Sequence, residues 1–327
     1  MIITRTPLRI SIGGGGTDLP SYYQEFGGFV ISAAIDKYAY VSANRSFRPG
    51  YILKYSEMEV VQERSQIRHP LIREALTTHD IPGPVEIVSI ADVPAGTGLG
   101  SSGTFLVGLI HALHAFKRNP VGPEALAREA VDIEMNRLHE PVGKQDQYSA
   151  AYGGLLCQEY LPNGEVKAYR LRIQEQAIQE LRESLMLFFV GTTRSASQLL
   201  VDQKTKSDQR DSEMLEALHF VKQLGLEIRA VLESGRVLEF GRLMHEHWLR
   251  KRRRSEGISS GRIDELYELG RTKGGAIGGK LVGAGGGGFL LFSTEDRSRL
   301  RRVMNEEGIA EMDFAFDFDG SVVLARS

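Results

Sequence analysis

Glycine residues and residues with hydroxyl side chains are concentrated in one stretch, Asp92–Phe105, which reads DVPAGTGLGSSGTF. A strand pattern at Val85–Ile90 precedes it, and a helical pattern of apolar residues follows it. Glycines before a helix let backbone N–H groups approach an anion at the positive end of the helix dipole. A serine hydroxyl there can also ligate a magnesium ion that bridges phosphates. The stretch predicts a phosphate-binding loop, and its alternative is a flexible turn with a serine cap.

Two more glycine clusters lie at 13–16 and 274–288, and both are typical of loops between periodic segments. Within the second, GGAIGGKL fits the Walker A spacing but places Leu281 where Ser or Thr must bind magnesium. GAGGGG at 283–288 fits the dinucleotide fingerprint, but the strand FLLF follows where that fingerprint needs a helix. We therefore reject both nucleotide-binding motifs for this cluster.

Charged residues near the other loops have both a binding and a structural interpretation. Asp18 follows Thr17 after the first glycine cluster, where it could bind a ligand or cap a helix that starts near Leu19. Arg194 comes directly after the buried strand pattern LMLFFV, at a strand end where binding residues often lie. The run Lys251–Arg254 could bind an anion or complement the dipole at a solvated helix end.

The composition excludes several classes of protein. The 327 residues are 42% hydrophobic and 25% charged, with a net charge of -2, so neither a nucleic-acid nor a membrane partner is indicated. The single cysteine, Cys157, rules out an intrachain disulfide and a Cys-rich metal site. The N-terminus lacks the apolar core of a signal peptide, and no run of about 18 apolar residues predicts a membrane span. We expect a cytoplasmic protein that is a monomer or homodimer.

The hydrophobic periodicity predicts mostly strands in the first part of the chain and mostly helices after residue 195. The predicted strands are Thr4–Ile12, Gly28–Ala43, Val85–Ile90, Gly153–Tyr160, Val166–Leu171, Leu185–Val190, 289–292 and Ser321–Ala325. The predicted helices are Ser102–Phe116, Pro123–Leu138, Ser195–Gln209, Ser212–Glu233, Val237–Arg254, Arg262–Lys273 and 296–307. The change of pattern predicts two domains, 1–190 and 191–327.

The three glycine stretches together resemble the motifs of one enzyme family. PAGTGLGSSG, from Pro94 to Gly103, resembles the central P-x-x-x-G-L-G-S-S-A motif of the GHMP kinases, with Gly103 where alanine is common. RTPLRISIGGGGTD resembles the first motif, and LVGAGGGGF at 281–289 resembles the third. All three occur in order and span almost the whole chain. The resemblance implies an α+β GHMP kinase fold with an N-terminal ribosomal protein S5 domain 2-like domain and a C-terminal ferredoxin-like domain.

The resemblance also implies ATP and Mg²⁺ as cofactors and assigns the residues that bind them. Ser102 and Glu134 would hold the metal, although Glu134 taken alone could be a solvated carboxylate on a helix. The residues implied to bind the nucleotide are Pro94, Gly96, Thr97, Gly98, Leu99, Gly100, Ser101, Ser102, Gly103, Gly285 and Gly286.

Two residues would carry the catalysis that the resemblance implies. Asp146, about a dozen positions after Glu134, matches the family's catalytic aspartate and would accept the proton of the acceptor hydroxyl. Its structural alternative is a helix-start cap after Gly143. Arg9 would lie close to Asp146 and offset the charge on the phosphates.

The segments GGGGTD, EMNRLHEPVGKQDQY, GTTRSAS and HEHWLRKRR narrow the resemblance to the branch that contains D-glycero-D-manno-heptose 7-phosphate kinase. That branch implies a small-molecule partner, a sugar phosphate, phosphorylated at its anomeric hydroxyl. Thr17, Asp18, Arg194 and Lys251 would bind this sugar. The alternatives are a 1-kinase for an unphosphorylated sugar such as L-fucose or galactose, and a non-catalytic sugar or nucleotide sensor.

Overall fold

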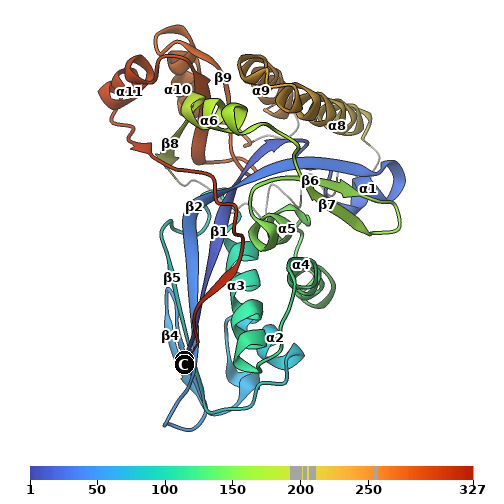
Figure 1. Ribbon diagram of the computed structural model, residues 1–327, viewed down its shortest axis with the longest axis vertical. Coiled ribbons are helices and arrows are strands. Elements are labelled where there is room, and N and C mark those ends of the chain that lie inside the picture. The colour runs from blue at the N-terminus through green and yellow to red at the C-terminus, as the bar shows by residue number, and fades with distance from the viewer. Residues whose placement is uncertain (192–200, 202–204, 206–210, 253–256, 327) are drawn as a thin grey trace.

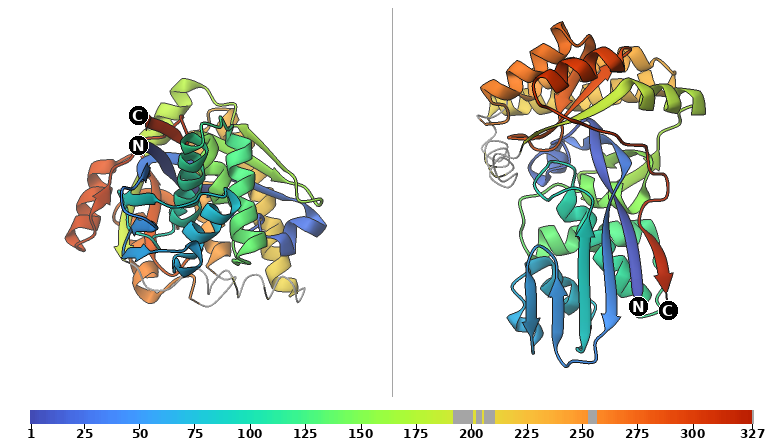
Figure 2. Two further views of the ribbon diagram at one scale, coloured as in Figure 1. Left: turned by 90° about the horizontal axis from the view of Figure 1, so that it is seen from below. Right: turned by 90° about the vertical axis from the view of Figure 1, so that its left-hand side faces the viewer.

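The computed structural model describes residues 1–191, 201, 205, 211–252 and 257–326. These residues form two sheets, one in the lower and one in the upper part of the molecule (Figure 1), and each is covered by helices. The right-hand view of Figure 2 shows the upper helices lying across the end of the lower sheet. The described helices include none with both the length and the apolar character needed to cross a lipid bilayer.

The lower sheet is built on two long antiparallel strands, β1 (Ile2–Gly13) and β2 (Gly28–Arg45), which pair from Ile2↔Ala43 to Gly13↔Ile31. Its strand order is β12-β1-β2-β5-β3-β4, and β6 and β7 join through β2. The remaining strands are β3 (Tyr51–Lys54), β4 (Met58–Val61), β5 (Val85–Ala91), β6 (Leu155–Tyr160), β7 (Val166–Arg170) and β12 (Val322–Arg326).

Helices cover one face of this sheet, and α3 (Ser101–Phe116) packs against both β1 and β2. Most of its side chains are buried, because further helices cover it on the side away from the sheet. The other elements of this part are α1 (Pro20–Phe26), η1 (Arg64–Gln66), α2 (Pro70–Thr78), α4 (Pro123–Val131), the π-helical turn η2 (Asp132–Arg137) and α5 (Gln145–Tyr152). The α3 helix carries the residues after the central glycine loop into the interior.

The upper sheet has the antiparallel order β11-β8-β10-β9. Its strands are β8 (Leu185–Gly191), β9 (Ala276–Leu281), β10 (Gly288–Thr294) and β11 (Glu311–Met312). Its helices are α6 (Glu175–Ser184), α8 (Ser212–Glu233), α9 (Val237–Lys251), α10 (Gly261–Thr272) and α11 (Arg297–Glu306). The α8 helix has the predicted bounds, and the expected helix Ser195–Gln209 lies mostly outside the described residues.

The prediction of a continuous loop at 274–288 is wrong, because residues 276–281 form β9. The high glycine content comes from close packing of β9 against α9: a Cβ on Gly278 would lie 2.0 Å from the carbonyl oxygen of Gly241. Glycine density was therefore a signal of close backbone approach, which sequence patterns do not separate from loop propensity.

One apolar core joins the two sheets. It contains Leu8 and Ile10 of β1, Leu187 of β8, Ile228 of α8 and Leu291 of β10, all fully buried. The chain ends also cross between the parts, because β12 returns to pair with β1 while β8 already belongs to the upper sheet. Figure 2 shows the two termini side by side. The division at residue 190 stays a prediction. The strand β8 begins before this residue but belongs to the upper sheet, and β12 follows it but belongs to the lower sheet.

Candidate active site

Arg9 on β1 and Asp146 on α5 form an ion pair at the centre of the molecule. Arg9 Nε donates to Asp146 Oδ1 at 2.7 Å, Nη2 forms an ion pair with the same oxygen at 2.6 Å, and Nη1 donates to the carbonyl of Gly98 at 2.6 Å. Gln145 Nε2 donates to the same Oδ1 at 3.3 Å. Among the described residues, no hydrogen bond reaches Asp146 Oδ2. One carboxylate oxygen is thus held in place, and the other can meet a ligand.

The start of α3 lies directly against this pair. Gly100 is the N-cap, with a left-handed φ of 79°, and no side chain caps the helix. A Cβ on Gly100 would lie 3.1 Å from the carboxylate carbon of Asp146. The serine-cap alternative is therefore wrong, and the first N–H groups of α3 keep their capacity to bind an anion. Asp146 does not cap α5 either, since Lys144 is the N-cap and has no side-chain hydrogen bond there.

Glu134 lies on the π-helical turn η2 and faces the start of α3. Ser102 Oγ donates to Glu134 Oε1 at 2.6 Å, and Gln147 Nε2 donates to Oε2. Burial, with Glu134 only 1% exposed, raises the pKa of this carboxyl to about 7, although both hydrogen bonds oppose the shift. The alternative of a solvated helix carboxylate is therefore wrong. Wider helical turns of this kind recur at functional sites.

Two polar atoms beside this cluster of hydroxyl and carboxylate oxygens have no hydrogen-bond partner among the described residues. Ser101 Oγ and Gln147 Oε1 are buried without a hydrogen-bond partner, although buried polar atoms are normally paired. Oxygen ligands from Ser102 and Glu134 match the preference of Mg²⁺. The donor set therefore fits the magnesium ion that the family resemblance implies.

Asp18 is the second carboxylate of the site. Its Oδ1 accepts from the backbone N–H of Gly16 and its Oδ2 from that of Gln145, each at 3.2 Å. It does not cap α1, whose N-cap is Leu19 without a side-chain bond. Burial, and then the charge of Asp146, raise the pKa of Asp18. The two carboxylates are thus close enough to repel each other.

The central and third glycine loops pack backbone against backbone. A Cβ on Gly98 would lie 2.6 Å from the carbonyl oxygen of Val282, and a Cβ on Gly283 would lie 2.5 Å from the Cα of Gly98. Side chains at either position would separate the loops. A Cβ on Gly96, in contrast, would meet no atom within 4 Å. The open side of the central loop therefore lies at Gly96.

The other nucleotide-site predictions fall within the same two loops. Thr97 is fully buried, and its hydroxyl donates to the carbonyl of Pro94 at 3.1 Å. The carbonyl of Leu99 accepts from the backbone N–H of Arg9 at 3.0 Å. Gly103 packs on Asp146. Gly285 and Gly286 lie against Ile258, whose carbonyl accepts from the Gly286 N–H at 2.9 Å. Their role in nucleotide binding stays a prediction.

Two predicted sugar-binding residues have protein partners, and their role in sugar binding stays a prediction. The Thr17 hydroxyl is fully buried and lies 2.9 and 3.0 Å from the carbonyl oxygens of Gly14 and Phe29, which share its single proton. Lys251 is buried, and its ammonium donates to the carbonyls of Leu281, at 3.0 Å, and Gly283. These bonds give both residues a part in shaping loops. Arg194 lies outside the described residues.

Sequence reasoning missed Gln145 and Lys280. Gln145 links the two carboxylates, since its backbone binds Asp18 and its side chain binds Asp146. Lys280 is 1% exposed, and its ammonium lies 3.2 Å from both the carbonyl of Ile12 and Nδ1 of His247. The available signal is a lysine in an otherwise apolar, glycine-rich strand.

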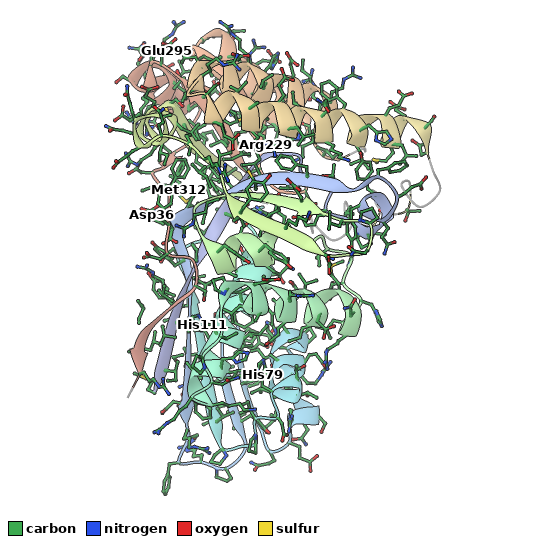
Figure 3. All side chains as sticks on the ribbon, turned by 45° about the vertical axis from the view of Figure 1, so that its right-hand side comes forward. Asp36, His79, His111, Arg229, Glu295 and Met312 are labelled. Carbon is green, nitrogen blue, oxygen red and sulfur yellow. The ribbon has the colours of Figure 1, made fainter. Side chains whose placement is uncertain are left out.

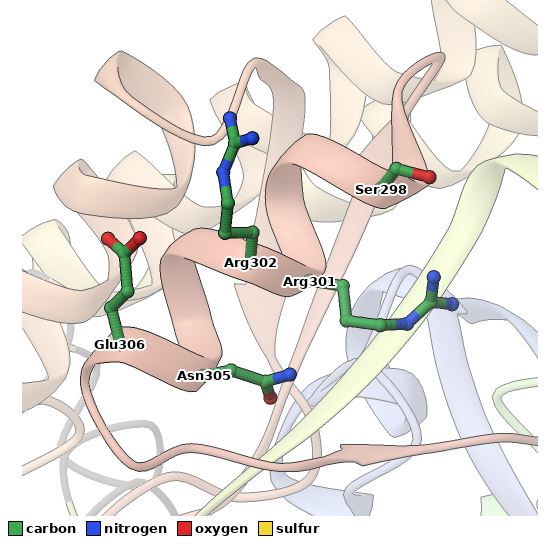
Figure 4. A pocket seen from close by; sticks show the side chains of 5 residues that line it. All are labelled: Ser298, Arg301, Arg302, Asn305 and Glu306. Atoms are coloured by element: carbon green, nitrogen blue, oxygen red, sulfur yellow. The ribbon is translucent and has the colours of Figure 1, made fainter.

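A surface hollow of about 550 Å³ lies away from these loops, along α11. Figure 4 shows that its side chains come from one helix and point apart, with the Arg301 guanidinium directed away from Arg302. Arg301 Nε donates to Glu311 at 2.6 Å. A single exposed helix face encloses no ligand, so this hollow is no rival to the site.

Comparison with known proteins agrees with the geometry. The family model described as GHMP kinases N terminal domain matches residues 66–154, and GHMP kinases C terminal matches residues 228–310. A D-glycero-alpha-D-manno-heptose 7-phosphate kinase from Campylobacter jejuni is 30% identical, over 98% of this chain and 97% of its own. An L-fucokinase/L-fucose-1-P guanylyltransferase from Bacteroides fragilis is 24% identical, over 92% of this chain and 36% of its own.

A solved structure is similar over its full length. The crystal structure of a D-glycero-D-manno-heptose 1-phosphate kinase from Bacteroides thetaiotaomicron is 27% identical, with a TM-score of 0.82 over 100% of both chains. Two family models and a full-length relative therefore coincide with a site that holds a paired aspartate beside a helix N-terminus. This chain belongs to the GHMP kinase family and is a sugar kinase.

Proposed function

We propose that this kinase transfers the γ-phosphate of ATP to the anomeric hydroxyl of D-glycero-D-manno-heptose 7-phosphate and produces the 1,7-bisphosphate. The observation that carries the chemistry is the state of Asp146, with Oδ1 held by Arg9 and Oδ2 accepting no hydrogen bond from the described residues. The choice of sugar is supported by the relative named for heptose 7-phosphate, which aligns over almost all of both chains.

In the proposed reaction, Asp146 Oδ2 accepts the proton of the sugar hydroxyl while the hydroxyl oxygen attacks the phosphorus. Arg9 holds the carboxylate in position through Oδ1. Asp18 binds hydroxyls of the sugar on the same side, because it lies close enough to Asp146 for their charges to interact. The N–H groups at the start of α3 and the open side of the central loop at Gly96 bind the phosphates.

Ser102 and Glu134 are the proposed Mg²⁺ ligands, since their oxygens already meet at 2.6 Å. When bound, the ion neutralises charge on the phosphates of ATP. Gln147 orients Glu134 from the other side through its side-chain amide. The buried oxygens of Ser101 and Gln147 that have no partner give this cluster further capacity for a hydrated ion.

A phosphate on the acceptor needs cationic groups near the first glycine loop. Lys280, at 1% exposure, is bonded to the carbonyl of Ile12 and to His247, so it supports the end of β1 beside that loop and does not itself reach a ligand. Arg194 and Lys251 stay predictions for the role of binding that phosphate. A lysine ammonium is a compact donor that suits a phosphate dianion.

The test is a coupled ADP-release assay with ATP and a panel of heptose 7-phosphate, free heptose, L-fucose and galactose. We expect the highest kcat/KM with heptose 7-phosphate. Asp146→Asn should lower kcat by about 10²–10⁴-fold, the usual contribution of a general base. Asp319→Asn removes an exposed carboxylate, 66% accessible, that pairs with Arg5, and it serves as the matched control.

The panel also separates the alternatives. A higher kcat/KM for L-fucose or galactose than for heptose 7-phosphate would replace the proposed sugar and leave the kinase assignment intact. ADP release that no sugar stimulates would favour a sensor. An Asp146→Asn variant with the kcat of the wild type would refute the role proposed for Asp146.

A further inference from the structure

A second cluster of potential ligand atoms lies far from the site just described. His79 follows the last turn of α2, His114 lies near the end of α3, and Glu129 lies on α4. One ligand atom of each lies within 4.8 Å of the others, and no other group of three metal-binding side chains this close occurs among the described residues. His114 is 12 residues beyond Ser102 on α3, about 18 Å along the helix. Figure 3 places His79 in the lower part of the molecule.

The two imidazoles converge on a single carboxylate. His114 Nε2 lies 2.9 Å and His79 Nε2 3.3 Å from Glu129 Oε2. The rings are nearly perpendicular, at 80°, with centroids 4.8 Å apart. In a tetrahedral zinc site with ligand bonds of about 2.0–2.1 Å, the ligand atoms are about 3.3 Å apart. Small side-chain movements would therefore bring these three atoms onto one ion.

His79 gives the cluster an unsatisfied donor or acceptor. The residue is 8% exposed, and its buried Nε2 lies in ionic contact with Glu129 Oε2 at 3.3 Å but forms no well-aligned hydrogen bond within the described part of the chain. A buried ring nitrogen without a well-aligned hydrogen bond is costly. It points toward the carboxylate that His114, 7% exposed, already contacts. The cluster thus holds a second imidazole nitrogen beside the same carboxylate, without a well-aligned hydrogen bond.

The groups around the cluster are compatible with a cation. A hollow of about 440 Å³ opens beside it and would admit a water molecule as fourth ligand. Of the two arginines that line the hollow, Arg137 pairs with Asp132 at 2.8 Å and Glu74 at 3.2 Å, and Arg128 lies 3.5 Å from Glu124. Their charges are therefore offset by carboxylates.

The second ring nitrogen of His114 also has a suitable partner. The Asn119 side-chain amide lies 3.1 Å from His114 Nδ1. A metal on Nε2 requires the proton on Nδ1, and the Asn119 oxygen accepts that proton once the amide is turned. Such a second hydrogen bond orients histidine ligands in known metal sites.

We propose that His79, His114 and Glu129 form a zinc-binding site that joins α2, α3 and α4, with water as the fourth ligand. Two imidazoles and a carboxylate in tetrahedral arrangement are a ligand set typical of Zn²⁺. Binding would tie together three helices that cover the lower sheet. The site is separate from the proposed magnesium ligands and independent of the choice of sugar.

The experiment uses the untagged full-length chain, stripped of metal with a chelator, and zinc chloride alone as the probe. Isothermal titration should show one zinc ion bound per chain and a Tm that rises with zinc concentration. His79→Gln and His114→Gln should each weaken binding by about 100-fold or more, because changes even outside the ligand set cost about 10–100-fold. His219→Gln is the control, since His219 is exposed and contacts Tyr22.

Cobalt substitution keeps the test decisive if a histidine variant does not fold. Co²⁺ in the wild-type chain should give the intense visible absorption of a four-coordinate ion, and Glu129→Gln, which preserves the shape of the side chain, should abolish it. Absence of saturable zinc binding to the wild type would overturn the proposal. So would binding that both histidine variants retain, or a cobalt spectrum typical of six-coordination.

Discussion

At the residue scale, the site contains two carboxylates that are held by different hydrogen-bond donors. Asp146 is paired with a guanidinium on one oxygen. Asp18 is buried, its oxygens accept from two backbone N–H groups, and the charge of Asp146 adds to the effect of burial on its pKa. An ionised carboxylate in this position costs stability, and such a cost is expected where a group is kept for binding a ligand.

Asp18→Asn should therefore increase stability at neutral pH and reduce activity. Because the pKa of Asp18 is raised in the folded protein, the folded state binds its proton more tightly than the unfolded state. Its contribution to stability is complete below 3.8, the ordinary pKa of the side chain, and is lost as pH rises through the folded pKa. In urea unfolding, the Asn variant should have a higher free energy of unfolding than the wild type at about pH 7, and this difference should shrink toward about pH 3.5. An Asn variant that is less stable at neutral pH would contradict this account. The exposed Asp313, 77% accessible, provides a control substitution to Asn.

At the element scale, the central glycine loop has one side that packs closely on its neighbours and one side that faces open space. Gly98 packs against the backbone of the third loop and leaves no room for a side chain, whereas a Cβ on Gly100 would press on Asp146 at 3.1 Å and shift it. Gly96 has the same left-handed φ of 79° as Gly100, yet it faces open space. Alanine at Gly96 or at Gly100 should destabilise the backbone by a similar amount, about 1 kcal/mol. The pair therefore separates backbone strain from displacement of the catalytic carboxylate.

Gly100→Ala should lower kcat by about 100-fold, because its new methyl group displaces Asp146. Gly96→Ala should lower kcat less and mainly raise the KM for ATP, since its methyl group enters the space where the phosphates approach. Steady-state kinetics with both substrates varied measures the difference, and circular dichroism verifies the similar stability of the two variants. Equal losses of kcat would show that strain alone explains both.

At the scale of the whole molecule, the two sheets share one core. Leu187 of β8 and Leu8 of β1 belong to the same buried cluster, and β12 ties the end of the chain to the lower sheet. The single tryptophan, Trp248, is fully buried in a separate cluster of the upper part. Its fluorescence reports on the upper part alone.

The described core predicts one cooperative unfolding transition. Trp248 fluorescence and far-ultraviolet circular dichroism should give coincident urea curves, because neither part buries the shared cluster by itself. Leu187→Ala should reduce the free energy of unfolding by about 2–5 kcal/mol and shift both curves together. Leu238→Ala, at a residue 45% exposed, should change it little. Separate transitions by the two probes would show that the parts unfold independently.

Several features could be predicted because they depend on local sequence. The bounds of α3 and α8 follow from apolar periodicity, and the strand, glycine loop and helix around Ser102 follow from neighbouring residues. The family, and with it the pairing of Ser102 with Glu134 and of Arg9 with Asp146, followed from the ordered motifs. The structure brings both pairs within hydrogen-bond distance.

The remaining features depend on residues that are distant in sequence. Local patterns could not decide whether Asp18 and Asp146 cap helices or face a ligand, since the answer depends on which N–H groups the fold brings to them. Nor could they show that Lys251 binds loop carbonyls, or that Gly98 and Gly283 meet. By itself, the sequence determined the family, most local elements and the chemical groups available. Only the tertiary structure decided which atoms are already bonded and which remain for a ligand, because hydrogen-bond partners and close backbone contacts are set by packing between distant segments.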